Sequence, residues 1–129
     1  MNHSNSIICV LSVLASALPI FAAAPDFREQ IQPILESNCV RCHSATKVKG
    51  GLRMDSFEKL LEGGETADAL VPGNPAKSEL LVRIHLRPID EGVMPDEGQA
   101  LKPEEVALLD AWVKSGANWP EGLTLTERK

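Results

Sequence analysis

The sequence is poor in aromatic residues: Phe and Trp make up 4% of its 129 residues, and there is no Tyr. No stretch alternates apolar and polar residues convincingly enough to predict a β-strand, and there are no internal repeats. With 43% hydrophobic and 24% charged residues, the chain has the composition of one ordinary globular domain. Its core must rest on Leu, Ile, Val and two Trp, and a large flat cofactor in the middle would supply the missing apolar volume.

Charge is absent from residues 1–24, which contain no Asp, Glu, Lys or Arg. An apolar run from Ile7 to Phe21 ends in three alanines, which is typical of a secretory signal peptide. The run is short for a membrane span and is interrupted by Pro19, so an uncleaved membrane anchor is the weaker interpretation. We therefore expect residues 1–24 to be a signal peptide and residues 25–129 to form one periplasmic or otherwise exported domain.

Helical spacing and capping signals predict four to five short helices and an all-α fold. The irregular stretch 87–101 is long for a compact domain, and loops of that length are usually functional or mobile. The expected helices run from Asp26 toward Asn38 with a kink at Pro33, from Phe57 to the pair Gly63-Gly64, from an Asn74 cap and Pro75 to a point before Pro88, and from Pro103 to Gly116.

The most informative pattern is Cys39-Val40-Arg41-Cys42-His43, because C-x-x-C-H is the attachment signal for covalently bound haem c. The two thiols would form thioethers with the haem vinyl groups, and His43 would ligate the iron. On one helical turn, Cys39 and Cys42 would share a face from which both reach one flat macrocycle. Since Cys9 lies in the expected signal peptide, these are the two cysteines of the mature chain.

Other uses of a C-x-x-C pair fit the sequence less well. A zinc site needs four ligands, and the mature chain offers Cys39, Cys42, His43 and His85 without a second closely spaced pair. A thioredoxin-like redox pair needs a βαβ context, which the pattern does not predict. A simple disulfide is the plainest remaining alternative.

A low-spin electron-transfer haem needs a second axial ligand, and methionine gives a higher reduction potential than histidine. Met94 lies in the long loop beside Pro95, whose fixed φ helps to hold a non-helical segment against the haem. His85 on the third helix, Met54 soon after the motif, and an open or water-bound site are the alternatives. Met94 is the residue that we favour.

The chain carries more acid than base, with 13 Lys and Arg against 18 Asp and Glu, for a net charge of −5. This balance argues against binding nucleic acid or an anionic membrane. Charged residues in 37–54 are all basic, whereas 55–68 is mostly acidic. The plain interpretation is two solvated faces. Alternatively, the basic residues compensate the haem propionates or face a redox partner.

The sequence resembles the planctomycete-type cytochrome c domain, a family of monohaem c-type cytochromes. The resemblance implies an all-helical fold in which the first and last helices cross beside one haem, with Cys39, Cys42 and His43 holding it and Met94 as distal ligand. Two positions depart from the usual pattern, Met54 where leucine is common and Asp96 where a second proline often follows Met-Pro. The resemblance rests on Phe27, Ile31 to Leu35, the haem motif, Lys49 to Arg53, Gly63-Gly64, Val71 to Pro75, Ser78, Leu80-Leu81, Met94-Pro95, Ala107-Leu108 and Trp112.

Together these features predict an exported one-electron carrier with one His/Met-ligated haem c. It is not expected to be an enzyme, since no general base is recognisable beside a distal cavity. Its expected partners are unidentified redox proteins, with no membrane insertion of the mature domain and a monomeric state. A haem sensor with an open or displaceable distal site, and an interaction domain in which haem serves mainly as core, are the alternatives.

Overall fold

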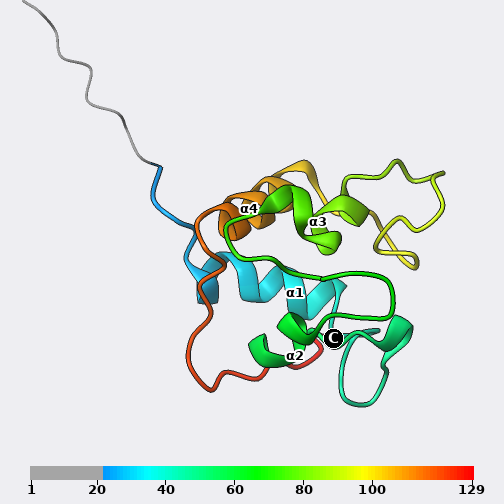
Figure 1. Cartoon of the computed structure of the whole chain (residues 1–129), viewed down its shortest axis with the longest axis horizontal. Coiled ribbons are helices and arrows are strands. Elements are labelled where there is room, and N and C mark those ends of the chain that lie inside the picture. Colours follow the sequence, from blue (N-terminus) through cyan, green and yellow to red (C-terminus); the bar gives the residue numbers. More distant parts are fainter. Residues whose placement is uncertain (1–21) are drawn as a thin grey trace, which may run out of the picture.

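In the described part of the chain, the fold consists of four short α-helices and three single helical turns. The computed structural model describes residues 22–129, and no strand occurs among them, which confirms the all-α expectation. Figure 1 shows α3 and α4 on one side of α1, and α2 on the other. The expected signal peptide lies almost entirely outside the described residues. The helices are α1 (Gln32–Asn38), α2 (Phe57–Glu62), α3 (Glu79–Ile84) and α4 (Pro103–Lys114), and the turns are Phe27–Ile31, Lys49–Gly51 and Pro75–Lys77.

The first helical segment begins where the sequence predicted and changes its winding at the proline. The Asp26 carboxylate accepts a hydrogen bond from the Glu29 N–H at 2.8 Å, as an N-cap does. In a capping box, a side chain of the first turn accepts from the N–H of the cap residue. Here the Asp26 N–H donates to the Gln30 side chain at 2.9 Å, so Gln30 takes this role, although Glu29, three residues after the cap, is at the usual position. A π-turn over Phe27–Ile31 precedes α1, in which Pro33 is the second residue. Since proline has no N–H to donate, the junction falls where that donor is missing.

The predicted third helix is broken into two pieces. Asn74 caps a 3₁₀ turn over Pro75–Lys77, and α3 begins only at Glu79. The Ser78 hydroxyl is fully buried, donates to backbone carbonyls of Val71 and Asn74, and accepts from the Val71 N–H at 2.9 Å. A serine hydroxyl that bonds to nearby backbone competes with helical hydrogen bonding, which explains the break.

The core is centred on an aromatic cluster that joins the two ends of the domain. The Phe27 ring lies 5.9 Å from the Trp112 ring and 4.6 Å from the Trp119 ring, between centroids. The buried Trp112 indole donates to the Asn118 carbonyl at 2.8 Å, so its polar edge is satisfied. The first helical segment therefore packs on α4 through these rings.

The C-terminal segment returns across α1 and α2 (Figure 1). The Leu125 N–H donates to the Asp55 carbonyl at 2.7 Å, and the Leu125 side chain is buried. The Arg128 guanidinium pairs with the buried Glu36 carboxylate at 2.7 Å. These contacts fix the end of α1, from which the haem motif follows. Over residues 22–129, every helix is too short and too polar to cross a lipid bilayer.

Candidate haem site

The haem motif forms one hydrogen-bonded turn directly after α1. Cys39 is the C-cap of that helix, and the N–H groups of Cys42 and His43 donate to the Cys39 carbonyl at 3.1 and 3.0 Å. The Met54 N–H in turn donates to the His43 carbonyl at 2.8 Å. We call residues 39–55 the motif segment. Backbone hydrogen bonds hold it at both ends, so the positions of its side chains depend little on long flexible groups.

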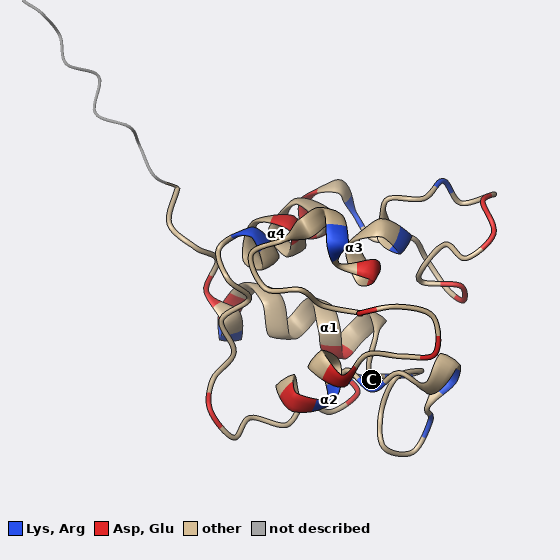
Figure 2. Ribbon diagram, in the orientation of Figure 1, with Lys and Arg blue, Asp and Glu red and all other residues tan. Residues whose placement is uncertain are grey.

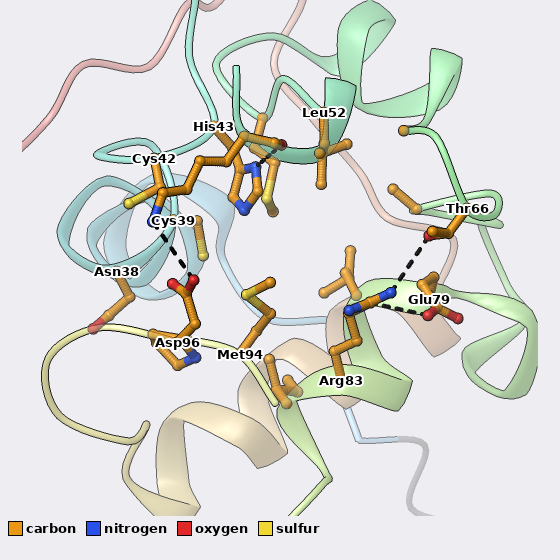
Figure 3. Close-up of a pocket in the computed structure, with 18 of the residues that line it drawn as sticks. Asn38, Cys39, Cys42, His43, Leu52, Thr66, Glu79, Arg83, Met94 and Asp96 are labelled. Carbon is orange, nitrogen blue, oxygen red and sulfur yellow. Dashed lines mark hydrogen bonds and ion pairs between the residues drawn. The ribbon is translucent and has the colours of Figure 1, made fainter. Parts of the chain in front are cut away.

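A cavity of about 410 Å³ opens beside this turn, and all four predicted site residues line it. Ligand sites in proteins commonly enclose roughly 300–1,000 Å³. In Figure 3 the His43 ring and the Met94 side chain reach into the cavity from opposite sides, with Cys39 and Cys42 at one edge. Apolar side chains make up much of the remaining wall, namely Leu52, Met54, Leu80, Ile84, Leu101 and Leu109.

The His43 ring is oriented by its own backbone neighbourhood. Its Nδ1 lies 3.0 Å from the Lys49 carbonyl oxygen, which can only accept a hydrogen bond. Nδ1 must therefore carry the proton, which leaves the Nε2 lone pair directed toward the cavity (Figure 3). A histidine that ligates a metal usually donates its other ring N–H in this way, so His43 fits an iron ligand.

The three candidates for the opposite ligand lie in different places. Met94 is half-buried and lines the cavity from the loop of residues 85–102, which we call the methionine loop. Met54 is buried and also lines the cavity. Its backbone N–H is hydrogen-bonded to the His43 carbonyl, so it lies on the same wall of the cavity as the histidine. His85 is absent from the lining and lies on the exposed surface, with Nε2 2.9 Å from both Asp110 carboxylate oxygens. The geometry therefore favours Met94 over the other two.

The two motif cysteines do not form a disulfide with each other. Burial raises the pKa of the Cys39 thiol to about 12, with the neighbouring Cys42 acting in the same direction. This direction is opposite to the lowered pKa that activates the thiol of a disulfide oxidoreductase. Within residues 22–129, no group of three or more His, Cys, Asp or Glu side chains is arranged to hold a metal ion. The zinc alternative needs His85 beside Cys39, Cys42 and His43, but His85 lies outside the cavity against Asp110.

The basic residues of the motif segment pair with the protein's own acceptors. The Lys49 ammonium contacts the carboxylates of Glu97 at 2.8 Å and Asp96 at 3.5 Å, and the Arg41 guanidinium donates to the Glu97 carbonyl at 3.0 Å. Figure 2 shows basic residues on the loop between α1 and α2. Lys49 therefore contacts both walls of the cavity, through its carbonyl on the His43 side and through its side chain on the Met94 side.

The sequence did not identify the polar residues that line the cavity far from the motif. Arg83 and Glu79 lie one helical turn apart on α3, and Thr66 lies on the loop after α2. Their i, i+4 spacing could have predicted the Arg83–Glu79 ion pair, which measures 3.0 Å. It could not have placed that pair at the haem cavity, because this placement depends on how α3 packs.

Taken together, two cysteines, an imidazole whose Nε2 is directed toward the cavity and a thioether line one largely apolar cavity, and this set of side chains fits the haem c class. Residues 39–98 match the family model described as planctomycete cytochrome C. The match supports the resemblance found in the sequence over this part of the chain, and the family implies haem c as cofactor. No curated protein and no solved structure matches the chain.

Proposed function

We propose that this protein is an exported monohaem c-type cytochrome that carries single electrons, with His43 and Met94 as the axial ligands of its iron. The observation that carries the proposal is the placement of Cys39, Cys42, His43 and Met94 on one largely apolar cavity. Haem c, when bound, supplies reversible one-electron exchange between ferric and ferrous iron. The residues around it determine the ligands, the solvent access and the charge that the cofactor meets.

Each proposed haem residue has a separate task. Cys39 and Cys42 attach the macrocycle through thioethers, which keeps it in place independently of the iron's oxidation state. His43 donates its Nδ1 hydrogen to the Lys49 carbonyl, which fixes the ring and makes Nε2 a better ligand. Met94 offers a thioether, a soft neutral ligand that favours ferrous iron and so raises the reduction potential relative to histidine.

The apolar wall supports electron transfer in a second way. Leu80 and Leu109 are buried, and both line the cavity next to the proposed ligands. A wall of this kind excludes water, so few solvent dipoles have to reorient when the charge on the cofactor changes. This environment suits a carrier better than a ligand-binding sensor, whose distal side has to admit a ligand.

An absorption spectrum of the exported protein, together with its mass, tests attachment and export. We expect a mass that corresponds to a chain beginning near residue 25 with one haem added. A mass without haem sinks the proposal, and a haem protein that retains residues 1–24 contradicts export with cleavage.

Three matched variants test the axial ligand. The ferric protein should show the weak long-wavelength absorption band of Fe–S(Met) ligation. Met94→Leu should abolish this band, whereas Met54→Leu and His85→Ala should keep it, because only Met94 faces His43 across the cavity. Loss of the band in Met54→Leu alone would assign the ligand to Met54. Rapid carbon monoxide binding to the unmodified ferrous protein would instead indicate the sensor.

A further inference from the structure

Arg83 grips the methionine loop with its backbone and its side chain. The Arg83 carbonyl accepts a hydrogen bond from the Met94 N–H at 3.2 Å. Its guanidinium Nη1 donates to the Gly92 carbonyl at 3.2 Å, two residues earlier in the same loop. Both bonds lie within three residues of chain, so one residue of α3 determines where the Met94 backbone sits.

The Arg83 side chain is itself held in place. Its Nε donates to the Glu79 carboxylate at 3.0 Å, one turn earlier on α3, and Nη2 reaches the Thr66 hydroxyl at 3.4 Å. The side chain is only 27% exposed and lines the cavity (Figure 3). A guanidinium has its donors in a rigid planar fork, so three acceptors in different directions fix its orientation.

The loop is shaped to receive this side chain. Gly92 has φ = +83°, a conformation that L-residues with a Cβ rarely adopt. A Cβ placed there would meet Arg83 Nη1 at 3.0 Å. The backbone of the loop thus passes close to the guanidinium at a position where a Cβ would crowd it.

We propose that Arg83 is a positioning residue that fixes the Met94 thioether for iron ligation. This inference rests on the proposed function. Other charged contacts of the loop join His85 to Asp110, and Asp96 and Glu97 to Lys49, all through more exposed groups. Arg83 is the contact nearest to Met94 in the chain, and its side chain is the more shielded. Without it, the loop would keep the Met94 backbone bond but lose the Gly92 anchor, and the thioether would leave the iron more often.

The test compares Arg83→Gln with Arg87→Gln in the haem-loaded protein. Arg87 lies on the methionine loop itself, its guanidinium forms an ion pair with Asp90, and its side chain is 77% exposed. Arg87→Gln therefore provides a control for the loss of one positive charge. For Arg83→Gln we expect a weaker Fe–S(Met) band, a lower reduction potential and roughly tenfold stronger carbon monoxide binding by ferrous protein, the size of effect that loss of a charge-assisted hydrogen bond produces. Arg87→Gln should leave all three unchanged.

The outcomes separate this inference from the proposal beneath it. If the unmodified protein lacks the band, Met94 ligation is wrong and the role of Arg83 falls with it. If the unmodified protein has the band and Arg83→Gln keeps the band and the potential while losing only thermal stability, Arg83 is merely structural. If Arg83→Gln yields no haem protein, Glu79→Ala applies the milder test, because it removes the carboxylate that accepts from the Arg83 Nε. A partly lost band is then expected, and an intact band overturns the inference.

Discussion

The two walls of the cavity are built in different ways. The motif segment, residues 39–55, is held by backbone hydrogen bonds and by the end of α1, where Leu35 and Val40 are buried. The methionine loop, residues 85–102, contains no helix, and its Ile89 side chain is 83% exposed. Charged side chains from α3 and from the motif segment tie it down. The position of the motif segment, which carries His43, is therefore determined locally. The position of the methionine loop, which carries Met94, depends on contacts from elsewhere in the chain.

Removing both motif thiols should give the largest effect. The double variant Cys39→Ser, Cys42→Ser has no sulfur to form thioethers, so we expect the mature protein to lose its covalent haem completely. Mass spectrometry of the denatured protein measures this directly. Cys9→Ser, in the expected signal peptide, is the matched control and should leave the mature mass unchanged. Haem that stays attached in the double variant would contradict the assignment of the motif.

Burial predicts the next largest difference between the two walls. Leu35 is fully buried just before the motif, and Leu35→Ala should lower the free energy of unfolding by about 2–5 kcal/mol because it leaves a cavity in the core. Ile89→Ala on the methionine loop should change it by less than about 0.5 kcal/mol. Chemical denaturation of the haem-loaded proteins compares the two. Equal losses would show that the loop is packed as firmly as the core.

Two aspartates make a pH test of the same comparison. The Arg53 guanidinium lowers the pKa of the buried Asp55 carboxyl, and Arg87 lowers the pKa of Asp90. A lowered folded-state pKa stabilises the protein above the unfolded pKa, about 3.9, and this contribution disappears as pH falls through the folded value. Asp55→Asn should therefore cost about 1–3 kcal/mol at pH 7 and much less near pH 2. Asp90→Asn should change stability little at either pH, because its ion pair is exposed.

The smallest effect on stability is expected at Lys49. Its ion pairs with Asp96 and Glu97 are solvent-exposed, and such pairs are screened by salt. Lys49→Gln should shift the denaturation midpoint only slightly, and raising the ionic strength should shift the unmodified protein in the same direction. A shift as large as that of Leu35→Ala would show that the ion pairs of Lys49 with Asp96 and Glu97 are a main source of stability.

Local signals predicted the helices well, and the predicted third helix is interrupted where a side chain bonds to backbone outside that helix. Helix α2 has Ser56 as its N-cap and ends before Gly63, close to the expected limits, because a cap and a stop signal act within one turn. The third helix was predicted as continuous, but the buried Ser78 hydroxyl interrupts it by bonding to the Val71 backbone, seven residues away. Propensity and periodicity contain no information about such a partner.

For the site, the sequence by itself determined the haem motif, since Cys39, Cys42 and His43 share one turn whose geometry local hydrogen bonds set. It also restricted the opposite ligand to a short set of candidates. Only the tertiary structure distinguishes their positions: Met94 lines the cavity across from His43, Met54 lines it with its backbone hydrogen-bonded to His43, and His85 lies outside it against Asp110. These positions favour Met94. The reason is physical: a turn depends on neighbours in the chain, whereas a residue 51 positions after His43 faces it only through the packing of α3 and the side chains that hold the loop.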